Sequence, residues 1–179
     1  MMSVIFYYFG IIIFIFSYDL SQCFRLQLTP GVPMVRQFDT NYVEDVILKT
    51  RRNGRRSEYV FSIEFTSKHF WANNNVSLHF IFYEYLHNEY RPSFVEMHYK
   101  ICDLILKDML LGPVVRKAGI TVCPLPPGRY RMMNMTFNRE FPSVWPFEKG
   151  KCEEIIKLEP SGKDIARGDL VLSFKMLKT

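Results

Sequence analysis

Apolar and polar residues alternate along much of the chain, as they do in strands that bury one face. The alternation is clearest over residues 59–65 and 76–83. Strands are also expected at residues 43–50, 130–137, 153–159 and 170–177. The pattern therefore predicts a protein built mainly from antiparallel strands.

One segment breaks this pattern. From Tyr99 to Leu111 the apolar residues recur at helical spacing, with charged residues between them. Gly112-Pro113 follows and is expected to end that helix. The fold class predicted is a two-layer antiparallel β-sandwich with one helix, at about residues 99–111.

The composition fits a single globular domain. Hydrophobic residues make up 48% and charged residues 23% of the 179 residues, which excludes disorder of the whole chain. The 16 Phe, 10 Tyr and 2 Trp exceed the ordinary needs of a core. This excess suggests a further use for apolar surface.

The first residues are expected to lie outside this domain. Residues 4–16 carry no charge and have the length of the hydrophobic region of a signal peptide. We expect a signal peptide at residues 1–17 and one secreted domain at residues 18–179. The alternative is a membrane anchor, because no Lys or Arg precedes the run and no A-x-A site follows it. The absence of a basic flank after the run favours cleavage.

The cysteines and two sequons fit an extracellular compartment. Cys23, Cys102, Cys123 and Cys152 all follow the expected cleavage, which predicts two disulfides with three connectivities open. No C-x-x-C occurs, so neither a zinc knuckle nor a thioredoxin-type redox site is indicated. Asn75 and Asn134 begin sequons and are the expected glycosylation sites.

Four arginines, Arg51, Arg52, Arg55 and Arg56, flank Asn53-Gly54, a pair typical of tight hairpin turns. The net charge of +5 is modest and largely local to them, so nucleic acid is not an expected partner. Guanidinium groups on a hairpin tip suit a phosphate, a sulfate or a sialylated headgroup. The alternative is a solvated turn.

Catalytic signatures are missing from the sequence. It contains no G-x-S-x-G, H-E-x-x-H, P-loop or G-x-G-x-x-G. Its four histidines are scattered, and Cys102, at helical spacing from His98, is expected to be bridged. A metal site is therefore disfavoured. We expect no enzymatic activity, no cofactor and no metal.

The C-terminal half contains a set of short motifs: Ile101-Cys102-Asp103, Thr121-Val122-Cys123-Pro124, Pro127-Gly128-x-Tyr130, Asn134, Pro142, Pro146 and Gly150. Through these motifs the chain resembles a large insect family of small secreted proteins. The better-known members are the Che chemosensory proteins of gustatory bristles. That family is remotely similar to the ganglioside-activator protein and the ML lipid-recognition domains, β-sandwiches that hold acyl chains between their sheets.

This resemblance implies a disulfide between Cys102 and Cys123, and leaves Cys23 with Cys152 as the remaining pair. It also implies an ML-like fold with a cavity between the sheets. It carries over no catalytic residue.

Two functions fit the sequence. The first is a secreted carrier of a hydrophobic ligand, a lipid or pheromone, in a chemosensory setting. The rival is an extracellular module with a closed core that contacts a receptor or matrix partner; a membrane surface is a further partner to test. Because strand faces alternate, the candidates for lining a cavity are Phe61, Ile63, Phe80, Phe82, Met132, Leu172 and Phe174. Sequence alone does not separate a cavity wall from a filled core.

Overall fold

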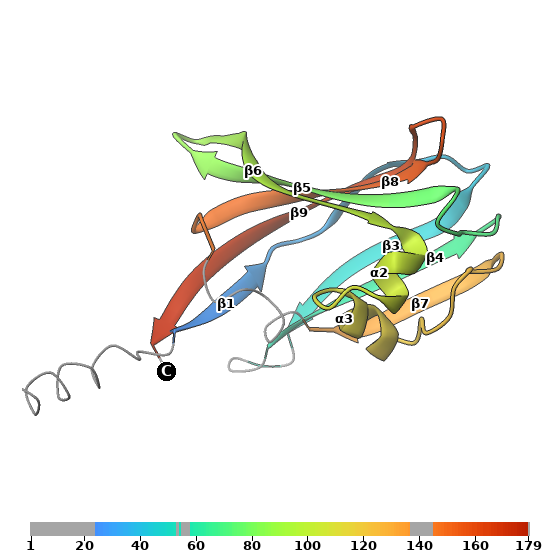
Figure 1. The fold of residues 1–179 in the computed structure, drawn as a ribbon. Helices are drawn as coiled ribbons and strands as arrows, with labels where there is room; N and C mark the ends of the chain where they lie inside the picture. Colours follow the sequence, from blue (N-terminus) through green and yellow to red (C-terminus); the bar gives the residue numbers. More distant parts are fainter. Residues whose placement is uncertain (1–23, 53, 55–57, 137–144, 179) are drawn as a thin grey trace, which may run out of the picture.

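The computed structural model describes residues 24–52, 54, 58–136 and 145–178, which form two antiparallel sheets that face each other (Figure 1). Strands of the larger sheet are β1 (Phe24–Pro30), β2 (Met34–Phe38), β5 (Val76–Leu86), β6 (Glu89–Lys100), β8 (Lys149–Leu158) and β9 (Lys163–Lys178). Strands of the smaller sheet are β3 (Val43–Arg52), β4 (Tyr59–Ser67) and β7 (Gly128–Met135). The predicted two-layer antiparallel sandwich is confirmed.

The long strand β9 organises the larger sheet. Its order is β1-β9-β8-β5-β6, and β2 also pairs with β9, ahead of β1 along the same strand. The smaller sheet has the order β3-β4-β7. A strand occupies each of the six expected runs, as far as the structure describes them, whereas β1, β2 and β6 were not predicted.

The predicted single helix at about residues 99–111 is wrong in its extent. β6 continues to Lys100, and two short helices follow, α2 (Ile101–Leu106) and α3 (Gly112–Lys117). Asp108 divides them, because its carboxylate accepts hydrogen bonds from the backbone N–H groups of residues 110, 111 and 112. Gly112-Pro113 therefore begins a helix instead of ending one, as proline is tolerated in a first turn.

The hairpin between β3 and β4 is wider than predicted. Its last pair is Arg52 with Tyr59, so six residues connect the strands instead of a two-residue turn at Asn53-Gly54. Gly54 has a φ of 116°, which favours glycine.

Two of the four cysteines behave as expected. Cys102 and Cys123 form a disulfide with their Cα atoms 5.4 Å apart, which confirms that pairing. The bond joins α2 to the segment between α3 and β7. Cys152 is a free, buried thiol, so its expected disulfide with Cys23 is wrong; Cys23 itself lies outside the described residues.

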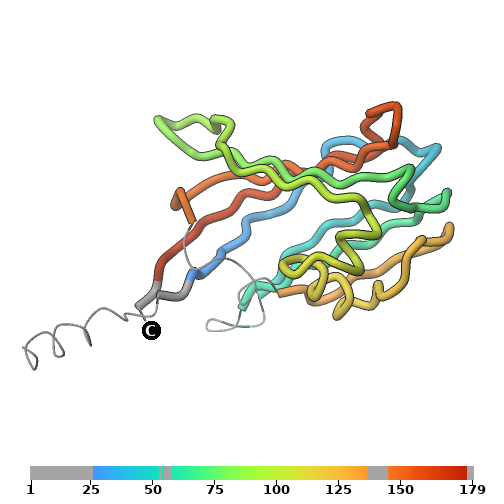
Figure 2. Tube along the Cα trace, viewed as in Figure 1, coloured from blue at the N-terminus to red at the C-terminus, as the bar shows by residue number. Residues whose placement is uncertain are grey.

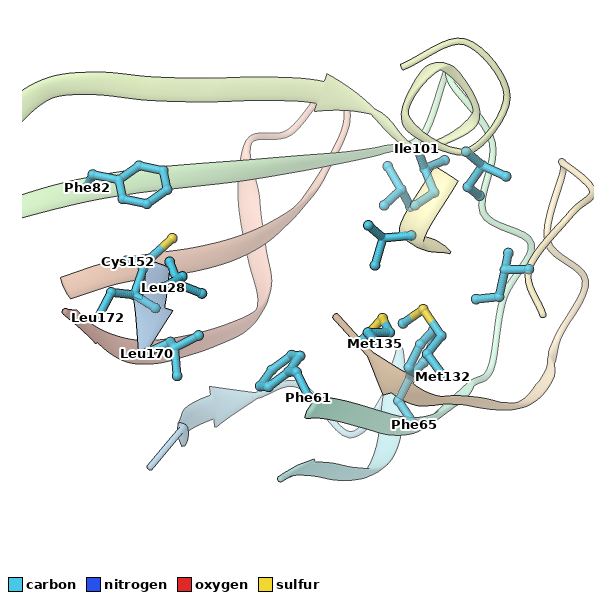
Figure 3. Packing of buried hydrophobic residues seen from close by; sticks show 14 of the residues in the cluster. Leu28, Phe61, Phe65, Phe82, Ile101, Met132, Met135, Cys152, Leu170 and Leu172 are labelled. Atoms are coloured by element: carbon cyan, nitrogen blue, oxygen red, sulfur yellow. The ribbon is translucent and has the colours of Figure 1, made fainter. Parts of the chain in front are cut away.

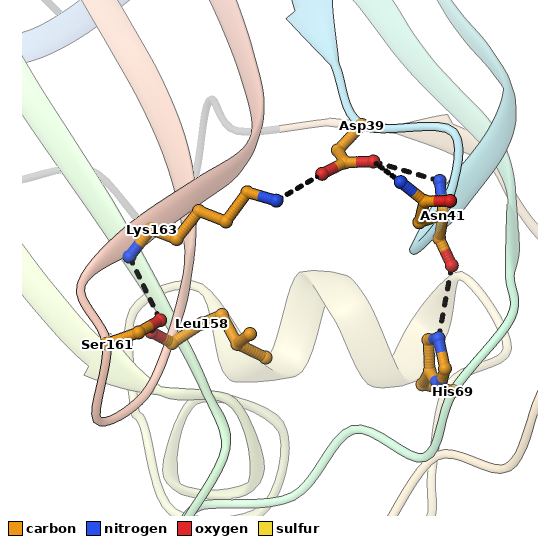
Figure 4. Close-up of polar contacts among 6 residues, drawn as sticks. All are labelled: Asp39, Asn41, His69, Leu158, Ser161 and Lys163. Carbon is orange, nitrogen blue, oxygen red and sulfur yellow. Dashed lines mark hydrogen bonds and ion pairs between the residues drawn. The ribbon is translucent and has the colours of Figure 1, made fainter.

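The sandwich is closed differently at its two edges. At one edge β2 contacts β3, and Lys163 at the start of β9 donates to Asp39 over 2.6 Å (Figure 4). This bond, with the N–H groups of Asn41 that donate to the same carboxylate, lowers the pKa of Asp39. At the other edge α2 packs against β5 and β6, and α3 against α2 and β7 (Figure 2). The helices therefore bridge the two sheets.

We predict that replacing both Cys102 and Cys123 with Ser lowers the free energy of unfolding by ~3 kcal/mol, since the loop that the bond closes would regain its freedom in the unfolded chain. Urea unfolding of the double variant beside the oxidised parent measures this. An unchanged midpoint would contradict the prediction.

We also predict that the Cys152 thiol resists alkylation until the protein unfolds. Burial, with smaller contributions from nearby carboxylates, raises its pKa well above the usual value. Peptide mapping after iodoacetamide treatment should find Cys152 modified only in denaturant. Recovery of a Cys152 disulfide from unreduced protein would contradict the prediction.

Candidate functional site: an apolar cavity between the sheets

A cavity of about 170 Å³ lies between the two sheets, on the side closed by the helices. Side chains from both sheets and both helices line it. The smaller sheet contributes Val46, Leu48, Phe61, Ile63, Phe65 and Met132, among others. The helices contribute Ile101, Leu104, Ile105, Val114 and Val115. The lining is almost entirely apolar.

Four of the seven predicted lining residues do line this cavity. These are Phe61, Ile63, Phe80 and Met132. Phe61 lies between the two groups of core side chains in Figure 3, with Met132, Met135 and Ile101 on one side and Phe82, Leu170 and Leu172 on the other. The interior thus has two halves.

The other three candidates, Phe82, Leu172 and Phe174, belong to the filled half. Trp145 occupies it: its ring stacks on Phe174 at 4.6 Å between centroids and meets Phe82 edge-on at 5.1 Å. Phe147 packs against both Trp145 and Phe174. Leu172 is buried in the same core. The expectation that these three line the cavity is therefore wrong.

Two paired rows face each other across the cavity. In the smaller sheet Leu48, Ile63 and Met132 pair across the three strands. In the larger sheet Val35, Gly168, Glu154 and Phe80 pair across β2, β9, β8 and β5. The rows touch, because a Cβ on Gly168 would lie 3.3 Å from Leu48 Cδ1.

Glu154 is the one acidic residue among the lining residues. Along β8 it alternates with its neighbours and so shares the inner face with Cys152, which belongs to the core. Burial, with the charge of Asp169 as a second cause, raises its pKa to about 7. Glu154 is half-buried and lines the cavity.

The side chain of the neighbouring Glu153, unlike that of Glu154, has hydrogen-bond partners among the described residues. It points to the outer face, where it accepts hydrogen bonds from Tyr83 Oη at 2.8 Å and Arg167 Nη1 at 2.7 Å. Arg167 also pairs with Asp164. The two adjacent glutamates therefore differ. Glu153 accepts hydrogen bonds from two side chains, whereas no described residue donates a hydrogen bond to Glu154.

The arginine candidates are separate from the cavity. Arg51 and Arg52 are exposed at the end of β3 and do not line it, and the Arg52 guanidinium lies 5.1 Å from the centre of the Tyr59 ring. Arg55 and Arg56 lie outside the described residues. The headgroup site on this hairpin stays a prediction.

The two sequons differ in their surroundings. Asn75 is held on both sides, since its amide donates to the carbonyl of Phe70 and its oxygen accepts from the N–H of Ala72, both at 2.7 Å. Asn134 is exposed at a bulge, with a φ of 56°. Glycosylation of either residue stays a prediction, and the surroundings favour Asn134.

Within the described part of the chain, no group of three or more His, Cys, Asp and Glu side chains could hold a metal ion. None of the helices described is long and apolar enough to cross a membrane.

Comparisons with known proteins find only a weak structural similarity. No protein-family model matches the chain, and no curated protein matches it. Among solved structures, the chain is similar to chicken MD-1, in the crystal structure of its complex with lipid IVa. The TM-score is 0.40 and the identity 9%, over 86% of this chain and 91% of that chain. Membership of the Che-type family stays a prediction.

We predict that Glu154→Gln stabilises the protein at high pH and not at low pH. Because the folded pKa of about 7 exceeds the ordinary 4.5, the parent loses stability as pH rises from about 4.5 to about 7, by at most about 3 kcal/mol. Above pH 7 the variant should regain that amount, and at pH 4 the two proteins should unfold alike.

Urea unfolding at pH 4 and pH 8 measures the difference. Glu89→Gln, in an exposed pair at the tip of the β5–β6 hairpin, is the matched control and should change stability little at either pH. Equal effects of Glu154→Gln at both pH values would place the carboxyl in solvent.

Proposed function

We propose that the chain is a secreted, extracellular protein that binds and carries a hydrophobic small molecule between its two sheets, without catalysing a reaction. The observation that supports this most directly is the apolar cavity. A packed sandwich has few voids larger than a water molecule, so an opening of about 170 Å³ is more than ordinary packing leaves. This favours the carrier over the closed-core module.

Secretion is supported by the uncharged run at residues 4–16 and by the disulfide between Cys102 and Cys123. The chemosensory setting, and a lipid or pheromone as the ligand, are proposed from the resemblance to the Che-type family. A membrane surface would meet the exposed end of β3 at Arg51 and Arg52.

The size of the cavity limits the ligand. An engineered cavity of roughly 150 Å³ in another protein takes up benzene, so this one suits one ring or a short chain. Burying about six methylenes yields ~5 kcal/mol before the cost of association. A longer chain would need the sheets to move apart.

We predict that Ile63→Phe abolishes ligand binding while the protein stays folded. Ile63 lines the cavity at the centre of the smaller sheet, so the larger ring should occupy the space of the ligand. Ile81→Phe makes the same change on the outer face of β5 and should leave binding intact.

Native mass spectrometry of the purified protein would show a bound ligand, and calorimetric titration with neutral compounds of six to twelve carbons would measure affinity. Circular dichroism would confirm that both variants fold. If no compound of any length binds the parent protein and no adduct is present, the closed-core module is the better proposal.

A further inference from the structure

The cavity has a polar feature that a container for hydrocarbon does not need. Glu154 lines it together with Phe80 and Gly168, its paired neighbours on β5 and β9. Neither neighbour has a polar side-chain group, and Leu48 covers Gly168 from the opposite sheet. The carboxyl therefore borders the cavity from the middle of its wall.

The carboxyl oxygens have unused hydrogen-bonding capacity. Among the described residues, none donates a hydrogen bond to Glu154 and none forms an ion pair with it. Arg167, which also lines the cavity, pairs with Glu153 and Asp164 instead. A buried carboxyl without partners costs free energy, and Glu153 shows that this same strand can satisfy an acid completely. A ligand with a hydrogen-bond donor would satisfy this carboxyl.

We infer that the ligand of this cavity is a small apolar molecule with a hydroxyl group, and that its O–H donates to the carboxyl of Glu154. The inference rests on the proposed function and names the class of ligand. The apolar lining holds the hydrocarbon body, while the single acid fixes the position of the hydroxyl.

A hydroxyl fits this acid better than the other common headgroups. It donates to the carboxylate and also accepts from the protonated acid, so it suits a carboxyl whose pKa lies near neutrality. A ligand carboxylate would bring a second negative charge into an apolar space. An ammonium would have to lose its strong hydration there.

Because the cavity is small, the hydrogen bond to Glu154 contributes a large share of the affinity. Because an apolar body of this size contributes little beyond the cost of association, one hydrogen bond to a charged group decides whether binding is measurable. Such a bond is worth about tenfold or more in affinity.

The test compares two ligands with the same number of heavy atoms, 1-hexanol and pentyl methyl ether. Both fit the cavity, and only the alcohol has a donor. Calorimetric titration of the full chain should give an affinity about tenfold higher for the alcohol than for the ether. In Glu154→Leu that preference should disappear, with the affinity for the ether unchanged or higher.

Glu89→Leu removes an exposed acid from the β5–β6 hairpin and should keep the parent's preference. If Glu154→Leu does not fold, Glu154→Gln serves instead; it retains an acceptor without charge, so the preference should fall without reversing. Hexylamine is the third ligand and should bind more weakly than the alcohol.

The outcomes separate the two proposals. Failure of all three compounds to bind the parent, together with no binding of the longer compounds and no adduct in native mass spectrometry, overturns the carrier itself. Equal affinities for alcohol and ether, a preference that survives in Glu154→Leu, or tighter binding of hexylamine overturns the hydroxyl inference and leaves the carrier standing.

Discussion

The packing of two short helices between the sheets is the constraint on which the interior depends. α2 packs against β5 and β6, and α3 packs against β7. The Cys102–Cys123 disulfide links α2 to the segment that follows α3. Asn73 accepts from the first N–H groups of α2, and a Cβ on Gly112 would lie 2.7 Å from the carbonyl of Leu104. This close packing fixes the spacing of the sheets, so the cavity beside the helices stays open.

The strands that sequence predicted are those whose alternation is unbroken. β4 and β5 carry apolar residues at every second position because each has strands on both sides and one face toward the interior. β6 was missed since it is an edge strand with Pro92 within it, a residue tolerated where no second neighbour needs the N–H. The helical pattern at 99–111 does correspond to helical turns, but Asp108 divides them into two helices. Because hydrophobic periodicity does not detect a side chain that caps a helix, this division was not predicted.

The sequence predicted which face of each strand points to the interior, but not which residues of that face line the cavity. Phe80 and Phe82 share the inner face of β5, but only Phe80 reaches the cavity, because Trp145 fills the space beside Phe82. Trp145 is remote in sequence from the strands it packs on, so no local pattern placed it. Glu154 was missed because the run Glu153-Glu154-Ile155-Ile156 reads equally well with either glutamate inside.

The two halves of the interior show that the cavity is not a necessity of this sandwich. Where Trp145, Phe147 and Phe174 pack, aromatic rings in mutual contact fill the interior. Beside the helices, the chain instead combines an unfilled volume with a partly shielded acid, and each of these lowers stability by itself. A ligand that filled the volume and donated to Glu154 would relieve both costs at once, and its binding would stabilise the fold by mass action.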